Sequence, residues 1–316
     1  MTKDSYEQLT EKLQSATLCA LPQSAARMIQ LSKDPRNGPQ EHAVPILADI
    51  GLSTQILRFV NSSIFGFRCK ITSIPMALSL ASVRTIRNFV LWSGLFAMMP
   101  NPMCGPFSVR VLFQDSLRRA VFAKHVSLLL EDCDADDTFL CAILQDMSIP
   151  ILGKIWNQEY KEMLTECRHG VTRLSRIEQE RMGWNHAQAS AILANQWNLD
   201  GHIADTIVHH IDFDFTHLTA SEDKKAAVIA LSSLLPSVTS HIWREVELFL
   251  LGYNRLFNGQ VPDLKSLLAV TDERSADLMQ FICLGDTVIP LLEHHHNYIE
   301  SVKPVIDTPE TAEASA

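Results

Sequence analysis

The sequence predicts an all-α protein with two helical lobes, because helical patterns are dense and strand patterns are nearly absent. In "SVRTIRNFVLWSGLFAMM" (82–99), Ser82 is a plausible N-cap, and Val83, Ile86, Phe89 and Val90 follow at helical spacing. No run that alternates apolar and polar residues is long enough to propose a sheet. The chain of 316 residues is 47% hydrophobic, with 12 Gly and 14 Pro, which is the composition of a globular protein with a sizeable core.

Further helices are predicted from their capping residues. Ser175 and Glu178 in "SRIEQERM" have the spacing of a capping box. Asn185 precedes "HAQASAILANQWNL", Asp200 precedes "GHIADTIVHHI" and Asp263 precedes "LKSLLAV". These signals place most of the second half of the chain in short helices joined by turns.

The segment "PNPMCGP" at 100–106 divides the chain, because Pro and Gly end the long apolar helix there. We expect an N-terminal lobe over 17–99 and a C-terminal lobe over 107–302, joined by this linker. A helical extension over 1–16 precedes them. The polar, aromatic-free residues 303–316 are expected to be a disordered tail.

Composition favours a cytoplasmic protein without a membrane segment. The seven cysteines are scattered and contain no C-x-x-C pair, which is typical of reduced thiols. The N-terminus carries acidic residues and lacks the apolar core of a signal peptide. The uncharged run between Arg87 and Arg110 is interrupted by prolines, so it is expected to be a buried helix followed by a linker.

The net charge of −9 argues against a dedicated nucleic-acid binder. A basic strip formed by Arg68, Lys70, Arg84 and Arg87 keeps that function open as an alternative, which predicts binding that weakens steeply with salt.

Several catalytic motifs are missing from the sequence. It contains no Gly-rich phosphate loop and no G-x-S-x-G nucleophile elbow. The acidic run at 131–137, "EDCDADD", fails the EF-hand pattern at its glycine and at its final glutamate, so a solvated turn is expected. The tract His294–His296 is expected at an exposed helix end.

Metal-ligating side chains are the remaining candidates. His186 begins one predicted helix, while His209 and His210 lie late on the next one. Neighbouring residues on a helix point about 100° apart, so one of the two is expected to face a given site. Asp146 could add a carboxylate, whereas its neighbour Gln145 is a poor ligand.

The chain resembles the bacterial HDOD domain, a relative of the HD phosphohydrolases. The similar segments in the first lobe are "LPQSAARMIQLSKDP" (21–35), "ADIGLSTQILRFVNSSIFGF" (48–67) and "SIPMALSLASVRTIRNFVL" (73–91). Those in the second lobe are "FQDSLRRAVFAKHVSLL" (113–129), "FLCAILQDMSIPIL" (139–152), "MGWNHAQASAILANQWNL" (182–199) and "IADTIVHHID" (203–212).

The resemblance implies that a metal site of HD enzymes is degenerate here. Catalytic relatives use an early histidine, a His-Asp pair and a late aspartate. Asp115 stands at the first position, Gln145–Asp146 at the pair, and Ser232 or Ser233 at the last one. What survives is Asp146, His186 and one or both of His209 and His210. A catalytic metal needs about three firm ligands and an open position.

We therefore predict a non-catalytic module without metal or cofactor, acting in a bacterial signalling pathway by binding a protein partner or a small ligand. The residual site or ligand pocket would comprise Asp115, Gln145, Asp146, His186, His209 and His210. The predicted interaction surface comprises Asn61, Phe65, Arg68, Arg84 and Arg87. The alternative is a reduced metal-dependent phosphohydrolase, whose ligands would be Asp146, His186 and His209.

Overall fold

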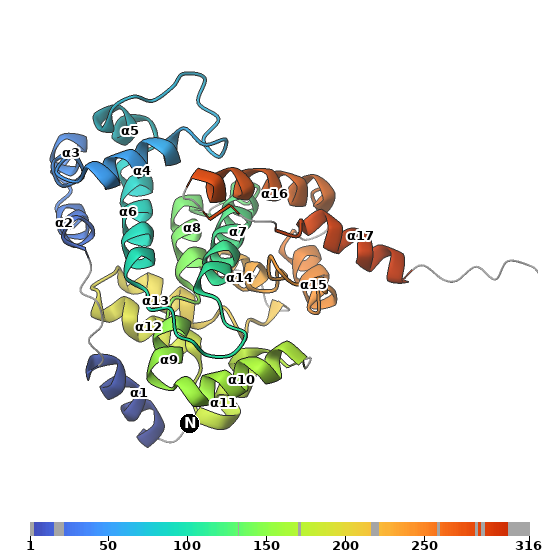
Figure 1. Ribbon diagram of the computed structural model, residues 1–316. Coiled ribbons are helices and arrows are strands. Elements are labelled where there is room, and N and C mark those ends of the chain that lie inside the picture. The colour runs from blue at the N-terminus through green and yellow to red at the C-terminus, as the bar shows by residue number, and fades with distance from the viewer. Residues whose placement is uncertain are drawn as a thin grey trace, which may run out of the picture.

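A computed structural model describes residues 3–15, 22–131, 133–169, 172–215, 221–257, 260–281, 284–285 and 288–302. Figure 1 shows helices joined by loops and turns, and no described residue belongs to a β-strand. The all-α prediction is confirmed. The predicted tail at 303–316 lies outside the described residues.

Five helices lie between α1 (Lys3–Ser15) and the Pro-rich segment at 100–106 and surround an aromatic core, and we call this group the first lobe. They are α2 (Gln23–Ser32), α3 (Pro39–Leu47), α4 (Ile50–Val60), α5 (Ile74–Leu80) and α6 (Val83–Met98). Ser82 caps α6 as predicted, because its side chain accepts a hydrogen bond from the Thr85 amide. Phe59 and Phe89 stack with ring centroids 4.1 Å apart, which joins α4 to α6.

The helices after the Pro-rich segment, which we call the second lobe, pack around α7 (Val109–Leu128), and most apolar residues of α7 are buried. Its other helices are α8 (Ala135–Leu144), α9 (Ile149–Ile155), α10 (Asn157–His169), α11 (Leu174–Met182), α12 (His186–Gln196), α13 (Gly201–Val208), α14 (Ser221–Ser233), α15 (Val246–Leu256), α16 (Leu264–Phe281) and α17 (Leu291–Val302). Helices α8, α14 and α16 pack on α7, so α7 forms the centre of this lobe. Ala120 and Ala123 are fully buried, and their small side chains allow these helices to approach closely.

The N-terminal helix α1 (Lys3–Ser15) precedes the first lobe in the sequence, but it packs on α12 of the second lobe. Leu9 and Leu13, one turn apart, are fully buried. The predicted helical extension is therefore an element that completes the second lobe.

The Pro-rich segment between the lobes is anchored to the second lobe. Pro102 and Cys104 are buried, and both lie against Gly153 of α9. Gly105 has φ +61°, a left-handed conformation that favours glycine, and it lies beside Lys161 of α10. This packing holds the segment in place at several points along its length.

The acidic run contacts other helices, so the predicted solvated turn is wrong. Asp136 accepts hydrogen bonds from Thr85 of α6 (2.6 Å) and from Lys124 of α7 (2.9 Å). Asp137 contacts His202 and Lys225. These carboxylates join the two lobes and the helices around α8, and pairing offsets their desolvation.

Two other features complete the fold. His294 is buried, with its ring nitrogens 2.8 and 2.6 Å from the carbonyl oxygens of Pro290 and Ser240, so the expectation of an exposed histidine tract is wrong there. In the described part of the chain, one helical stretch, Ala135–Ile155, is long and apolar enough to cross a membrane, but 89% of its window is buried inside the fold. A core segment of a globular protein passes the same test.

Candidate functional site

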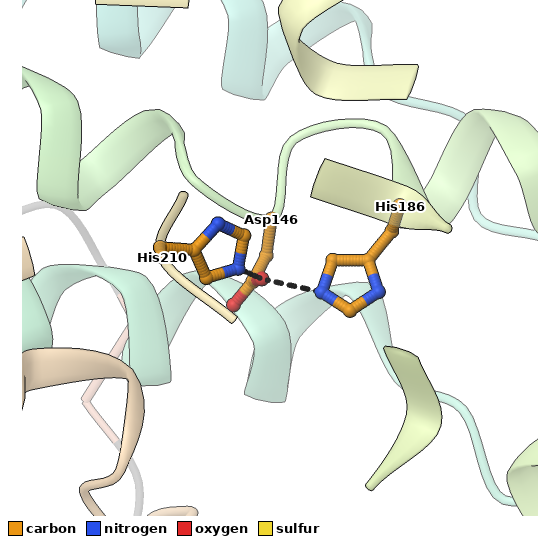
Figure 2. A group of neighbouring side chains, drawn as sticks. All are labelled: Asp146, His186 and His210. Atoms are coloured by element: carbon orange, nitrogen blue, oxygen red, sulfur yellow. Dashed lines mark ion pairs between the residues drawn. The ribbon is translucent and has the colours of Figure 1, made fainter. Parts of the chain in front are cut away.

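Asp146, His186 and His210 meet in the second lobe, although long stretches of sequence separate them. Asp146 lies in the turn between α8 and α9, His186 is the first residue of α12, and His210 follows the end of α13. One ligand atom from each lies within 4.8 Å of the other two. Figure 2 shows both imidazole rings directed at the same carboxylate oxygen, with Nε2 of each ring 3.3 Å from Asp146 Oδ1.

The orientation of His186 is set by the start of α12 and by a buried glutamate. Asn185 and Gln188 form a capping box that begins the helix at this residue. Glu178 Oε2 accepts hydrogen bonds from the His186 backbone amide (2.8 Å) and from Nδ1 (2.6 Å). Tyr160 donates to the other oxygen of Glu178 at 2.6 Å. The ring is thus fixed with Nε2 toward Asp146.

His186 is an imidazolium at neutral pH. Burial alone would lower its pKa, but the adjacent carboxylates of Glu178 and Asp146 dominate and raise it to about 10. Both ring nitrogens then donate, one to each carboxylate.

Asp146 is an anion paired with a partly buried arginine. Burial would raise the pKa of Asp146, but the Arg119 guanidinium and the His186 imidazolium hold it well below its usual range. Arg119, on α7, forms an ion pair with Asp146 Oδ2, and the two side chains are only 16% and 6% exposed. One carboxylate oxygen therefore faces the imidazoles and the other faces a fixed cation.

His210 has a different protonation state from His186. Its Nδ1 lies 2.7 Å from the Ile207 carbonyl oxygen, so this nitrogen carries the hydrogen. Burial lowers the pKa of His210, an effect that Asp146 only partly offsets. The neutral ring then presents a lone pair to Asp146 Oδ1. Two lone pairs that face each other at 3.3 Å favour a shared proton or a cation between them.

A cavity of about 220 Å³ lies beside this cluster, between α7, α11 and α14. Its lining includes Asp115, Arg173 and Glu245, besides the cluster itself. Asp115 Oδ1 accepts a hydrogen bond from the Val238 amide at 2.7 Å, and burial raises the pKa of this carboxyl. Arg173 and Glu245 form an ion pair at 2.8 Å. The cavity wall thus contains charges of both signs.

The structure brings together four of the six residues predicted for the residual site, namely Asp115, Asp146, His186 and His210. Gln145 is fully buried, does not line the cavity, and has no hydrogen-bond partner for its amide among the described residues. His209 is exposed, so its choice as the third metal ligand is wrong, and His210 takes that place.

Four charged residues at the site were missed in the sequence, namely Arg119, Arg173, Glu178 and Glu245. Glu178 has the spacing of a capping box with Ser175, but α11 already begins at Leu174, and the glutamate contacts His186 instead. Arg119 and Arg173 give no local signal. The periodicity of α7 does mark Arg119 as one turn beyond Asp115, on the same face.

The residues present do not fit the metal centre of a catalytic HD enzyme. At two positions where the resemblance to HD enzymes implies metal ligands stand Gln145 and either Ser232 or Ser233. The two serine hydroxyls donate to the carbonyls of Ile229 and Ala230 in their own helix, at 2.7 Å each. Asp146 is neutralised by Arg119, and protonated His186 lacks a free lone pair on Nε2.

The residues of the predicted interaction surface have separate roles. Asn61 is bonded within the protein, as it accepts from the Ile71 amide and donates to the carbonyls of Leu57 and Ile71. Arg84 pairs with Asp134, and Arg87 lies 3.7 Å from Asp200. The basic strip is therefore interrupted by acids, while Arg68 and Lys70 remain exposed.

The fold and site define a helical protein with a buried histidine–aspartate cluster. The sequence agrees with this description: residues 18–213 match the HDOD domain family. The chain belongs to that family, and the match covers more than half of its length.

Solved structures share the fold. An HDOD domain protein of unknown function from Geobacter sulfurreducens superimposes with a TM-score of 0.67 at 19% identity, over 88% of this chain and 98% of the other. A signal transduction protein from Marinobacter aquaeolei VT8, so described provisionally, has a TM-score of 0.65 at 16% identity, over 89% and 65%. A candidate phosphohydrolase from Shewanella amazonensis SB2B has a TM-score of 0.60 at 17% identity, over 94% of each chain. At these identities the similarity concerns the fold alone.

One curated relative is an uncharacterised protein of Treponema pallidum (strain Nichols), which is 24% identical over 207 residues. The alignment covers 60% of this chain and 37% of the relative, so the chain spans just over a third of that protein.

Proposed function

We propose that this protein is a non-catalytic HDOD module that acts in signal transduction by binding a protein partner or a small ligand. The observation that carries the proposal is the buried Arg119–Asp146 ion pair. A fixed guanidinium supplies the positive charge that a metal ion would bring to this carboxylate, so Asp146 is electrostatically satisfied by the protein itself.

Two further observations support binding. The description of the Marinobacter structure as a signal transduction protein agrees with a regulatory role for the fold. A groove of about 380 Å³ lies between two segments of the chain. One side is Ile29 of α2 with Lys33 just after that helix, and the other is Trp197 and Asn198 just after α12. A ligand in this groove would touch both lobes and could favour one arrangement of them.

A reduced metal-dependent phosphohydrolase is the second candidate. It is favoured by the three ligand atoms within 4.8 Å and by the lone pair that His210 presents to Asp146. A metal would have to displace the His186 proton and compete with Arg119 for Asp146.

Metal analysis of tag-free protein separates the two candidates. The proposal predicts no stoichiometric iron, manganese or zinc, and no hydrolysis of nucleotides or cyclic dinucleotides with added manganese. His209→Ala provides a matched control for His186→Ala, because His209 is an exposed neighbour of the site. Stoichiometric metal or turnover that is lost in His186→Ala and kept in His209→Ala would overturn the proposal.

The binding half of the proposal needs its own measurement. Partners would be captured from lysate of the source bacterium with the wild-type protein and with a Lys33→Ala/Trp197→Ala variant of the groove. We expect a defined partner or ligand whose retention depends on the groove. If both proteins retain the same material, the groove has no role in binding.

A further inference from the structure

The loop between α4 and α5 forms a pocket of about 400 Å³ on the first lobe, which we call the loop pocket. Its polar lining includes Ser62, Ser63, Arg68 and Lys70, with Gly66 between the serines and the cations. It lies in the "NSSIFGF" segment, away from the histidine–aspartate cluster of the second lobe.

The loop pocket carries two uncompensated positive charges. Arg68 and Lys70 are exposed, and within the described residues no acidic side chain lies within ion-pair distance of either one. Arg84 and Arg87, by contrast, face Asp134 and Asp200. On a chain with a net charge of −9, two neighbouring free cations form a local site of positive potential.

The pocket also contains an unused hydrogen-bonding group. The Ser63 hydroxyl is shielded from solvent and has no partner among the described residues. Such groups are normally satisfied, by protein, water or a ligand. The hydroxyl belongs to a residue that lines the same pocket as the two cations, so it can donate to an oxygen atom of a ligand bound there.

The loop is already held in one conformation. Asn61 makes three hydrogen bonds to the backbone on both sides, and Ser62 donates to the Phe59 carbonyl at 2.7 Å. Arg274 of α16 donates to the Ile64 carbonyl at 3.3 Å. Asn61 and Ser62 also occupy carbonyls at the C-terminal end of α4, which would otherwise repel an anion. A preformed site loses less entropy when it binds.

We infer that the loop pocket binds a single phosphate monoester group. Arg68 and Lys70 neutralise the charge and the Ser63 hydroxyl fixes one oxygen. One phosphate suits two cations, whereas a nucleic acid needs an extended run of them, which Asp134 and Asp200 interrupt. The inference deepens the proposed binding function by naming the chemistry of the ligand.

The test measures binding of phenyl phosphate, inorganic phosphate and a phosphoserine peptide by calorimetry at low salt. The wild-type protein is compared with Arg68→Ala/Lys70→Ala and with Ser63→Ala. Arg27→Ala/Arg36→Ala is the matched control, because both of its residues are exposed cations on the same lobe and neither lines the groove or the loop pocket. We expect saturable binding of the monoesters that weakens roughly tenfold or more in the Arg68/Lys70 variant, by a smaller factor in Ser63→Ala, and not in the control.

The outcomes identify the source of the phosphate. Tighter binding of the peptide than of phenyl phosphate indicates a phosphorylated protein partner, and equal binding indicates a small phosphate ester. Equal affinity in the wild-type and Arg68/Lys70 proteins would overturn the inference. So would an oligonucleotide that binds more tightly than every monoester with a steep salt dependence. The substituted residues lie outside the histidine–aspartate cluster, so we expect them to leave metal content and turnover unchanged. A negative result for phosphate binding would therefore overturn this inference without affecting the proposal that the protein is non-catalytic.

Discussion

Replacing Arg119 by methionine tests the reasoning about the site most directly. The substitution keeps much of the side-chain length but removes the cation paired with Asp146, whose side chain is only 6% exposed. Removal of one partner from a buried ion pair leaves an uncompensated charge and costs about 3–5 kcal/mol. The His186 imidazolium still donates to Asp146, so we expect the lower end of that range, about 3 kcal/mol.

The assay is urea unfolding at pH 7, with Arg176→Met as the control. Arg176 and Glu180 form an exposed pair, with 76% and 63% of their side chains accessible, and such pairs contribute about 0–1 kcal/mol. The double variant Arg119→Met/Asp146→Asn should recover part of the lost stability, because no unpaired charge remains. A loss below about 1 kcal/mol in Arg119→Met would refute the role of this ion pair.

The Arg119→Met variant also tests whether Arg119 prevents a metal ion from binding at Asp146. Without the guanidinium, the Asp146 carboxylate and the lone pair of His210 remain, and a cation that displaces the His186 proton becomes the simplest compensation for the carboxylate. We expect zinc to raise the unfolding midpoint of Arg119→Met but not that of the wild-type protein. Equal stabilisation of both proteins would show that Arg119 does not exclude metal.

Three other predictions concern pH and buried polar groups. Since the folded pKa of His186 is about 10, above the usual 6.5, its contribution is complete below pH 6.5 and is lost as the pH rises toward 10; urea titrations of His186→Gln should lack that decline. His125 is buried without a hydrogen-bond partner among the described residues, and burial lowers its pKa to about 4. Its neutral form therefore favours folding above pH 6.5, and that contribution falls between 6.5 and 4. His125→Leu should add about 1 kcal/mol at pH 7 and more at pH 5, and a less stable variant would contradict this. Asn61→Ala removes three hydrogen bonds of the loop and should cost about 2 kcal/mol in thermal unfolding, whereas a neutral effect would show that the loop is held by other contacts.

Local signals in the sequence predicted most of the helical fold. Ser82, Asn185 and Asp263 accept the capping hydrogen bonds expected of them. Such bonds involve residues three or four apart, which the sequence displays directly. Ser175 shows the limit of the method: its spacing to Glu178 is correct, but the helix begins earlier and the glutamate turns to a tertiary partner.

The site was only half predictable because its electrostatics depend on distant contacts. Arg119 and Asp146 are 27 residues apart, and nothing near either residue indicates the pair. The choice between His209 and His210 could not be made either, since α13 ends at Val208 and the two histidines leave the helical register. A turn, and not a helix face, decides which ring is directed inward.

The packing of α1 on α12 has a consequence for dividing the protein into parts. The order of the sequence suggests that a cut near 100–106 would separate two self-contained lobes. Such a cut would assign Leu9 and Leu13 to the fragment that does not bury them, and would leave their contact surface on α12 open to water. A second lobe expressed alone should therefore aggregate more readily than one supplied with residues 3–15 as a separate peptide. The first helix of the chain is therefore part of the structural unit formed by the second half of the chain.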